Sequence, residues 1–368
     1  MRAWWTALLF VVACSKSDSG DKNKPAELPK ESAGGSGTAA TGSGGSAAAG
    51  SAVGSGSAVG ETQRPPLPKL DVPARLEEVG TKFDDSLALA TKSGSQAAKD
   101  KCADLEPLYQ PFCSSGMAAA FLSKKGAAAK DFEPTMTKLD PAFVPVHCQS
   151  LGFAVEDSPK LAAIAKDLAT DTCRASFWDG HGFFRALSAA GAPTGVCRTE
   201  EGKAPDADAC AKQAEALAKA DLPATSCDAK KGRIPAGMEA ACAHGVGRSL
   251  VFMMNADAKH AIAACASKTP ALADACISGV GFVMTFPMPD RTDVAFDVMA
   301  GLETRTKAAF ARGVGRALAT WKHGDAKNLS NWLGALSSSE RREADRLADL
   351  HDKCASYYDL DKCEWQPK

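Results

Sequence analysis

The sequence predicts an all-α, disulfide-rich domain of helical hairpins, arranged as in an αα solenoid and preceded by a disordered tether. Three observations predict this fold class: apolar residues recur at helical spacing, a 34-residue pattern repeats, and the chain has 13 cysteines. No stretch alternates as a half-buried strand does. Aromatic residues make up only 7% of the chain, which also favours closely packed helices over a β-sandwich.

The N-terminus has the layout of a bacterial export signal. Met1 and Arg2 precede an apolar run over residues 3–13, which is shorter than the roughly 20 residues of a spanning helix. Val11-Val12-Ala13-Cys14 resembles the lipobox of bacterial lipoproteins. The resemblance implies a signal peptide over residues 1–13 and a diacylglycerol on Cys14. An ordinary signal peptide with a chance cysteine is the alternative.

The lipobox also implies a location and a first partner. Ser15 rather than Asp follows Cys14, which in lipoproteins implies sorting to the outer membrane of a Gram-negative bacterium. We expect a lipid-anchored protein of the cell envelope, with its domain outside the cytoplasm and the membrane as partner through Cys14. A further partner is expected in an envelope protein or the cell wall. The formal net charge of −1 provides no basic field for nucleic acid.

Residues 14–70 are predicted to form the lipidated N-terminus and a disordered tether. Residues 32–60 consist almost only of Gly, Ser, Ala, Thr and Val, which cannot bury enough apolar surface to offset their ordering entropy. A coil of about 50 residues reaches roughly 40 Å. The cysteine-rich helical domain is predicted over residues 71–368.

The first element of the domain is predicted from apolar spacing. Leu76, Val79, Phe83 and Leu87 follow one another at steps of three, four and four, which predicts a helix over residues 74–93. Later helix starts are predicted where a capping residue precedes proline. These pairs are Asp140-Pro141, Ser158-Pro159 and Thr269-Pro270.

The strongest internal pattern is the 34-residue repeat, which is clearest over residues 230–350. Each copy contains Gly-Val-Gly, and Cys242, Cys276 and Phe310 occupy the same position in successive copies. The copies lie at residues 241–248, 275–282 and 309–316, with degenerate copies expected at 113–116 and 177–182. Shorter accompanying helices are predicted over residues 257–266, 292–301 and 325–336, and the last of them is followed by residues 340–350, which lack the glycines. Chance similarity of Ala/Gly-rich helices is the alternative to a solenoid.

The paired glycines need a physical reason, because each costs about 1 kcal/mol relative to Ala inside a helix. Two residues correspond to about 200° around a helix, so the glycines face nearly opposite sides. A solenoid helix touches both the previous and the next unit. We therefore interpret each glycine as permitting one close helix–helix approach. A ligand-binding glycine turn is the alternative, but no strand precedes the pattern and no Lys-Ser/Thr follows it.

The cysteine count supports export. Removing Cys14 leaves an even number, 12, which an oxidising compartment allows to pair. In the third repeat Met299 and Phe310 stand where the second has Cys265 and Cys276, as expected for two sites that touch across a hairpin. The predicted local bridges are Cys102–Cys113, Cys265–Cys276 and Cys354–Cys363, followed by Cys148–Cys173, Cys197–Cys210 and Cys227–Cys242.

The hairpin cysteines, the Gly-x-Gly and the 34-residue period resemble the Sel-type repeats of secreted bacterial proteins over about residues 240–320. In that family the Gly-x-Gly lies in the turn after the first helix and is followed by Asp and Lys-Ala, which are missing here. The resemblance implies TPR-like helical hairpins and binding to proteins or to the cell envelope.

No catalytic residue, cofactor or metal site is predicted. His147 and His244 lie next to cysteines, but those cysteines are expected to form disulfides, and no CxxC occurs. The candidate binding surface combines a polar cluster beside Trp178 with two arginines at the same repeat position, a stripe suited to a carboxylate or phosphate. Its residues are Asp179, His181, Arg185, Arg248 and Arg316. A helix end with an aromatic plug and a solvated surface are the alternatives.

Two function classes follow from these features. The first is a membrane-anchored, non-catalytic module for protein or envelope binding, or for scaffolding. The second is an envelope enzyme whose site is assembled across the helical repeats. A shallow concave face favours the first class, whereas a deep pocket with several titratable side chains of shifted pKa favours the second.

Overall fold

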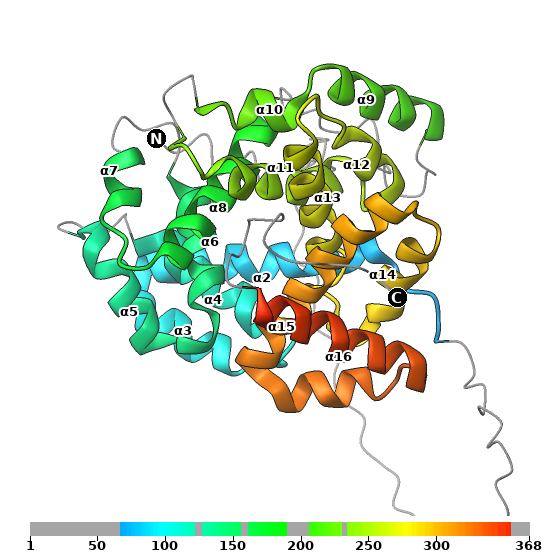
Figure 1. The fold of residues 1–368 in the computed structure, drawn as a ribbon. Coiled ribbons are helices and arrows are strands. Elements are labelled where there is room, and N and C mark those ends of the chain that lie inside the picture. Colours follow the sequence, from blue (N-terminus) through cyan, green and yellow to red (C-terminus); the bar gives the residue numbers. More distant parts are fainter. Residues whose placement is uncertain (1–66, 122–126, 156–160, 190–205, 230–233, 355–368) are drawn as a thin grey trace, which may run out of the picture. The chain divides into compact units, whose positions relative to one another are not determined.

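A computed structural model describes residues 67–121, 127–155, 161–189, 206–229 and 234–354 of the chain. Every regular element in these ranges is a helix and none is a strand, which confirms the predicted all-α class (Figure 1). None of these helices is both long and apolar enough to cross a bilayer. The predicted signal peptide, Cys14 and most of the predicted tether lie outside the described residues.

The long helices contact one another in chain order, each packing against the next. We call this series the long-helix stack. It consists of α2 (Val72–Ser93), α4 (Gln110–Phe121), α6 (Val144–Ala154), α8 (Asp171–Ala189), α11 (Glu239–Met253), α13 (Pro270–Val283), α15 (Thr304–Leu333) and α16 (Ser338–Lys353).

Further helices, most of them shorter, connect the members of the stack. They are α3 (Ser95–Ala103), η1 (Ala129–Asp131), α5 (Phe132–Leu139), η2 (Pro141–Phe143), α7 (Leu161–Lys166), α9 (Ala207–Lys219), α10 (Leu222–Ser226), α12 (Ala258–Ala264), η4 (Pro289–Arg291) and α14 (Thr292–Ala300). The alternation of long and short helices is the predicted hairpin architecture. The sequence did not predict α9 and α10, which lie between α8 and α11.

Helix starts follow the predicted signals in part. Helix α2 begins after Asp71, whose carboxylate accepts the amide N–H of Ala74 at 3.1 Å. Pro141 and Pro270 begin η2 and α13, although neither preceding side chain caps the helix. The Ser158-Pro159 pair lies outside the described residues.

The helix predicted over residues 325–336 is confirmed in its start. The segment α15 consists of two helices that meet at Asp325, and the second of them ends at Leu333. Asp325 has φ −151° and ψ 71°, so it forms a kink inside α15. Its carboxylate accepts the amide N–H of Asn328 at 3.1 Å, and thus caps the part of α15 beyond the kink.

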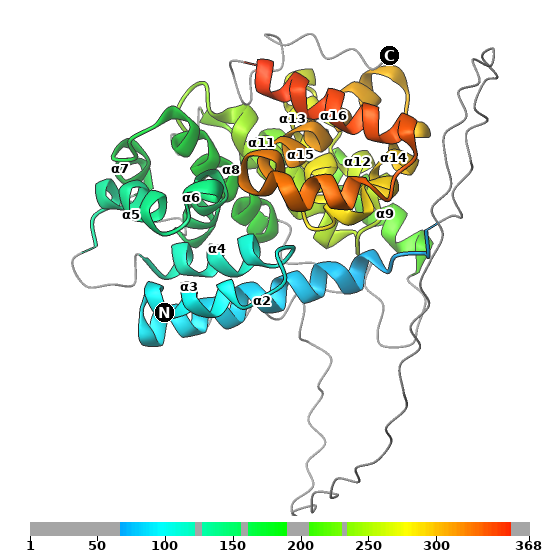
Figure 2. The same cartoon turned by 90° about the horizontal axis from the view of Figure 1, so that it is seen from below.

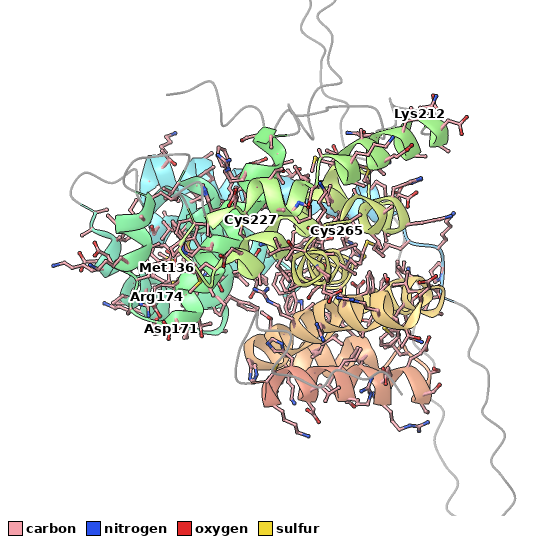
Figure 3. All side chains as sticks on the ribbon, turned by 45° about the horizontal axis from the view of Figure 1, so that its top comes forward. Met136, Asp171, Arg174, Lys212, Cys227 and Cys265 are labelled. Carbon is pink, nitrogen blue, oxygen red and sulfur yellow. A yellow bond between two sulfur atoms is a disulfide. The ribbon has the colours of Figure 1, made fainter. Side chains whose placement is uncertain are left out.

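Three of the four described disulfides join a short helix, or the residue that ends it, to the stack, and the fourth, Cys148–Cys173, joins α6 to α8. Cys102 bonds Cys113, and Cys265 bonds Cys276, each pair being 11 residues apart. Cys227 and Cys265 both follow the last residue of a short helix (Figure 3). The described pairs are Cys102–Cys113, Cys148–Cys173, Cys227–Cys242 and Cys265–Cys276, all as predicted. Cys210 and Cys354 are also in disulfides, and their predicted partners Cys197 and Cys363 lie outside the described residues.

The glycines of the repeat make the predicted close approaches on opposite sides of one helix. A Cβ on Gly279 would lie 1.9 Å from the carbonyl oxygen of His244 in the preceding helix. A Cβ on Gly281 would lie 2.2 Å from that of Phe310 in the following helix. Neither separation is sterically possible, so only glycine allows these backbones to touch. The same paired approaches are made by Gly180 and Gly182, and by Gly245 and Gly247.

This register extends to the N-terminal helices. The first glycine of each pair packs against the backbone carbonyl of the residue that precedes the first glycine of the previous helix. For example, Gly279 packs against His244, which precedes Gly245. Gly180 approaches the carbonyl of Gln149, so Ser150 holds the first-glycine position of α6. Gly116 approaches the backbone carbonyl of Phe83 in the same way, so Asp84 holds the first-glycine position of α2. The degenerate copies at 113–116 and 177–182 are therefore in register with the clear ones.

The beginning of the stack contacts its later helices. The Arg75 guanidinium in α2 pairs with Asp290 in η4, with an N–O distance of 3.0 Å. Phe143 packs edge-on against Trp321, at 5.5 Å between ring centroids. In Figure 2, α2 runs past α4 toward α14. These contacts bring the inner faces of six long helices around one space.

Candidate functional site

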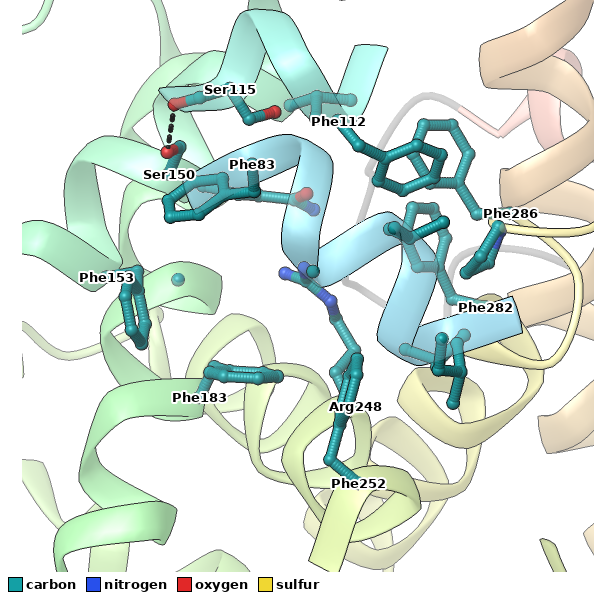
Figure 4. Close-up of a pocket in the computed structure, with 18 of the residues that line it drawn as sticks. Phe83, Phe112, Ser115, Ser150, Phe153, Phe183, Arg248, Phe252, Phe282 and Phe286 are labelled. Atoms are coloured by element: carbon teal, nitrogen blue, oxygen red, sulfur yellow. Dashed lines mark hydrogen bonds between the residues drawn. The ribbon is translucent and has the colours of Figure 1, made fainter. Parts of the chain in front are cut away.

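A cavity of about 190 Å³ lies on the inner side of the long-helix stack (Figure 4). Its wall comes from α2, α4, α6, α8, α11 and α13, and from the turn after α13. Seven phenylalanines dominate this wall: Phe83, Phe112, Phe153, Phe183, Phe252, Phe282 and Phe286. A concave, mostly apolar site with a few polar groups is typical of small-molecule binding.

The repeat register explains which side chains face the cavity. The residue three positions after the first-glycine position lines the wall in four successive helices of the stack. These residues are Phe153, Phe183, Arg248 and Phe282. One arginine therefore stands in a row of aromatic rings.

Arg248 is held by rings and by one carboxylate. Its guanidinium carbon lies 5.5 Å from the ring centroids of both Phe183 and Phe282. Its Nη1 donates to Oδ1 of Asp179 at 2.9 Å, the only hydrogen bond its guanidinium makes among the described residues. The side chain is 19% exposed and points into the cavity (Figure 4). The cavity thus contains a fixed cation with donor capacity left over.

Asp179 is the centre of a buried polar network. Both oxygens of this fully buried carboxylate are engaged: Oδ1 by Arg248, and Oδ2 by Gln149 and Arg316 at 2.9 and 3.0 Å. Burial raises the pKa of Asp179, but His244 and the two guanidinium groups outweigh burial and hold this pKa well below its usual range. Asp179 is therefore ionised, and its single negative charge is shared between two arginines.

His244 is a neutral member of this network. Its Nδ1 lies 3.1 Å from Oδ2 of Asp179 and its Nε2 lies 3.0 Å from Nη1 of Arg316. A carboxylate only accepts and a guanidinium only donates, so the proton of the ring is on Nδ1. Burial, together with the charge of Arg316, lowers the pKa of His244 to about 4. The histidine thus orients its neighbours without carrying charge near neutral pH.

Gln149 brings an unsatisfied acceptor to the wall. Its Nε2 donates to Oδ2 of Asp179, and because that carboxylate can only accept, the amide orientation is fixed. Oε1 of Gln149 is then buried with no hydrogen-bond partner among the described residues. Such a group costs about 1–3 kcal/mol of desolvation, unless a ligand or water supplies a donor.

Asp84 places a carboxyl group in the cavity wall itself, which Asp179 does not line. It stands at the first-glycine position of α2 and makes no hydrogen bond or ion pair within the described ranges. Burial, and then the charge of Asp85, raises the pKa of Asp84 to about 6. This carboxyl titrates just below neutrality at the edge of an apolar space.

The structure brings together only part of the predicted binding surface. Asp179, Arg248 and Arg316 meet, and the two arginines form part of the interior rather than a solvated stripe. His181 lies two residues from Asp179 and packs against the rings of Trp178 and Phe184. Arg185 is half-buried and is not part of the cavity wall.

Sequence reasoning missed Gln149, Asp84 and the row of phenylalanines. The signal for Gln149 was present, because it precedes the first-glycine position just as Asp179 and His244 do. Recognising it required placing α6 in the repeat, although Ser150 replaces the glycine there. The two cysteines considered as metal partners of histidines, Cys148 and Cys242, are both in disulfides.

Comparison with protein-family models, curated proteins and solved structures found no match to this chain.

Proposed function

We propose that this chain is a lipid-anchored, non-catalytic binding protein of the cell envelope that holds a small amphipathic ligand in its cavity. The observation that carries this proposal is a single guanidinium, that of Arg248, fixed within a wall of phenylalanine rings. The apolar wall favours an apolar ligand body, and the cation favours one anionic group.

The state of the titratable groups supports binding rather than catalysis. Asp179 has both oxygens engaged, and His244 is neutral with both ring nitrogens in contact with charged partners. Groups locked in this way position Arg248 but are poorly placed to transfer protons.

Asp84 is the observation that favours the enzyme alternative. A carboxyl with its pKa raised to about 6 in a cavity has the properties of a general acid or base. In an enzyme, Asp84→Asn would abolish turnover of the bound compound. In a binding protein, the compound is recovered unchanged from parent and variant alike.

The predicted export signal and tether support this location. Lipidation at Cys14, followed by the predicted tether, would let the domain reach ligands released near the membrane. In the Cys14→Ala variant the protein should move from the membrane fraction to the soluble envelope fraction. Retention of that variant in the detergent phase would contradict the anchor.

Ligand capture tests the binding proposal directly. The detergent-solubilised protein, purified from envelopes, should carry a small molecule that native mass spectrometry detects. Leu187→Trp fills the cavity from α8 and should remove it. Lys212→Trp adds the same ring to an exposed position of α9 and should retain it (Figure 3). Equal occupancy in both variants would overturn the proposed site.

A further inference from the structure

Resting on the proposed function, we infer that the ligand of the cavity is a single-ring aromatic 2-hydroxy acid, with its carboxylate on Arg248 and its hydroxyl group on Oε1 of Gln149. Size, wall chemistry, the anchored cation and the unsatisfied acceptor each restrict the ligand.

The volume restricts the ligand to about one ring. A cavity of about 150 Å³ lined by apolar side chains accommodates benzene. The present cavity is about 190 Å³, which leaves room for one ring and a short polar substituent.

The wall favours an aromatic body. Phe153 and Phe183 meet edge-to-face at 5.5 Å between centroids, and Phe282 stacks on Phe286 at 4.9 Å. Aromatic rings gain from such edge and offset contacts beyond the area they bury. An aromatic ligand thus extends a set of ring contacts that the protein already contains.

The cation favours a carboxylate. Arg248 cannot be deprotonated, and Asp179 and the rings of Phe183 and Phe282 hold its plane in place. A planar guanidinium matches the planar geometry of a carboxylate. A phosphate dianion would place a second negative charge in a mostly apolar space that also contains Asp84.

The unsatisfied acceptor specifies the hydroxyl. Gln149 and Arg248 bind the two oxygens of the same carboxylate, that of Asp179, so they lie side by side. A ligand whose carboxylate meets Arg248 therefore places the substituent on its neighbouring carbon close to Gln149. A hydroxyl donates to Oε1 without adding charge. An ammonium would bring a second cation beside Arg248, where the carboxylate of Asp179 is already shared by two guanidinium groups.

Calorimetry of the detergent-solubilised full chain tests this inference with three matched probes. The first is 3-phenyllactate, the second is 3-phenylpropionate, which lacks the hydroxyl, and the third is phenylalanine, which has an ammonium in its place. We expect 3-phenyllactate to bind about tenfold more tightly than either of the others. Equal affinities for the first two probes would overturn the role of Gln149. Tighter binding of phenylalanine would overturn the choice of a hydroxy acid.

Variants assign the two contacts. Gln149→Leu should remove the difference between 3-phenyllactate and 3-phenylpropionate while leaving binding of the latter nearly unchanged. Arg248→Gln should weaken both acids at least roughly thirtyfold. Arg248→Lys keeps the charge but not the planar fork, so it should give an intermediate loss. Arg305→Gln removes an exposed arginine that pairs with Asp274, and should bind as the parent does. Unchanged binding in Arg248→Gln would overturn the inference.

The failure of this inference is distinguishable from that of the proposed function. If none of the three acids binds, but Leu187→Trp still displaces the molecule captured from envelopes, the ligand class is wrong and the cavity remains a binding site. If Leu187→Trp displaces nothing, the proposed function fails as well. Thermal unfolding of each variant checks that the comparison is made between folded proteins.

Discussion

The contact between α8 and α11 and the contact between α13 and α15 have the same backbone geometry but different chemistry. A Cβ on Gly245 would lie 1.8 Å from the carbonyl oxygen of Asp179, and one on Gly313 would lie 1.9 Å from that of Ser278. The first contact contains the charged network beside the cavity, whereas the second has a small polar side chain at the same place.

This difference shows how the repeat separates packing from recognition. The glycine touches a backbone carbonyl, which every residue possesses, so the close approach does not depend on the side chain that precedes the glycine position. That side chain is free to vary along the stack. Asp179, His244 and Ser278 occupy equivalent positions, and only the first two take part in the network.

The two contacts should differ most in free energy of unfolding when the carboxylate of Asp179 is removed. Asp179→Ala leaves two guanidinium groups without their shared carboxylate, and we expect a loss of about 4 kcal/mol in the free energy of unfolding. Ser278→Ala, at the equivalent position, should change it by less than about 1 kcal/mol. Urea unfolding under oxidising conditions measures both. Similar losses would mean that the charged network does not distinguish the two contacts.

The glycines should show what the two contacts share. We expect Gly245→Ala, Gly279→Ala and Gly313→Ala to lose about 3 kcal/mol alike, because each added Cβ meets a carbonyl oxygen within 2 Å. Gly301→Ala is the matched control, since its nearest atom is 3.7 Å away, and it should stabilise by up to about 1 kcal/mol. Stabilisation of all four variants would contradict the packing role.

A disulfide distinguishes the second repeat from the third. Cys265 and Cys276 are bonded, whereas Met299 and Phe310 occupy the equivalent positions. Replacing both cysteines by Ala should lower the free energy of unfolding by about 2.8 kcal/mol, as the entropic model gives for an 11-residue separation. Urea unfolding of the double variant provides the measurement. No loss would show that apolar packing alone holds the hairpin.

The effect that is smallest per unit of change concerns the pH dependence of stability. Because its pKa is about 4 when folded, His244 binds fewer protons than in the unfolded state between pH 6.5 and 4, so it makes stability fall as the pH drops through this window. In His244→Gln, unfolding free energies at several pH values should show a slope reduced by at most about 1.4 kcal/mol per pH unit. The lowered pKa of His351 also makes stability fall with falling pH, and the raised pKa of Asp84 has the opposite effect. Both groups remain in the variant, so their contributions cancel in the comparison with the parent. An unchanged slope would mean that folding does not lower the pKa of His244.

Local spacing predicted much of the fold. Bridges between cysteines 11 to 25 residues apart, and paired glycines two residues apart, follow from helix geometry and short loops. The same geometry argues against the predicted polar cluster, because residues two apart on a helix, such as Asp179 and His181, face nearly opposite sides. Applying the glycine argument to this pair would have separated them.

The site depended on contacts that no local pattern records. Asp179 and Arg248 are 69 residues apart, with α9 and α10 between them, and Gln149 comes from a helix whose repeat has lost its first glycine. Phe112 and Phe286 meet only because the beginning of the stack contacts its later helices. Which side chains surround the cavity therefore could not be read from spacing alone.

The sequence by itself determined most of the stack helices, the hairpin disulfides and the opposite faces of each glycine pair, because each depends on residues within about one repeat of one another. Tertiary structure alone decided that Arg248 faces a space lined by phenylalanines, with Asp179 and Gln149 beside it. The physical reason is that a helix contact fixes the distance between neighbouring backbones, whereas a cavity is formed by the curvature summed over many such contacts.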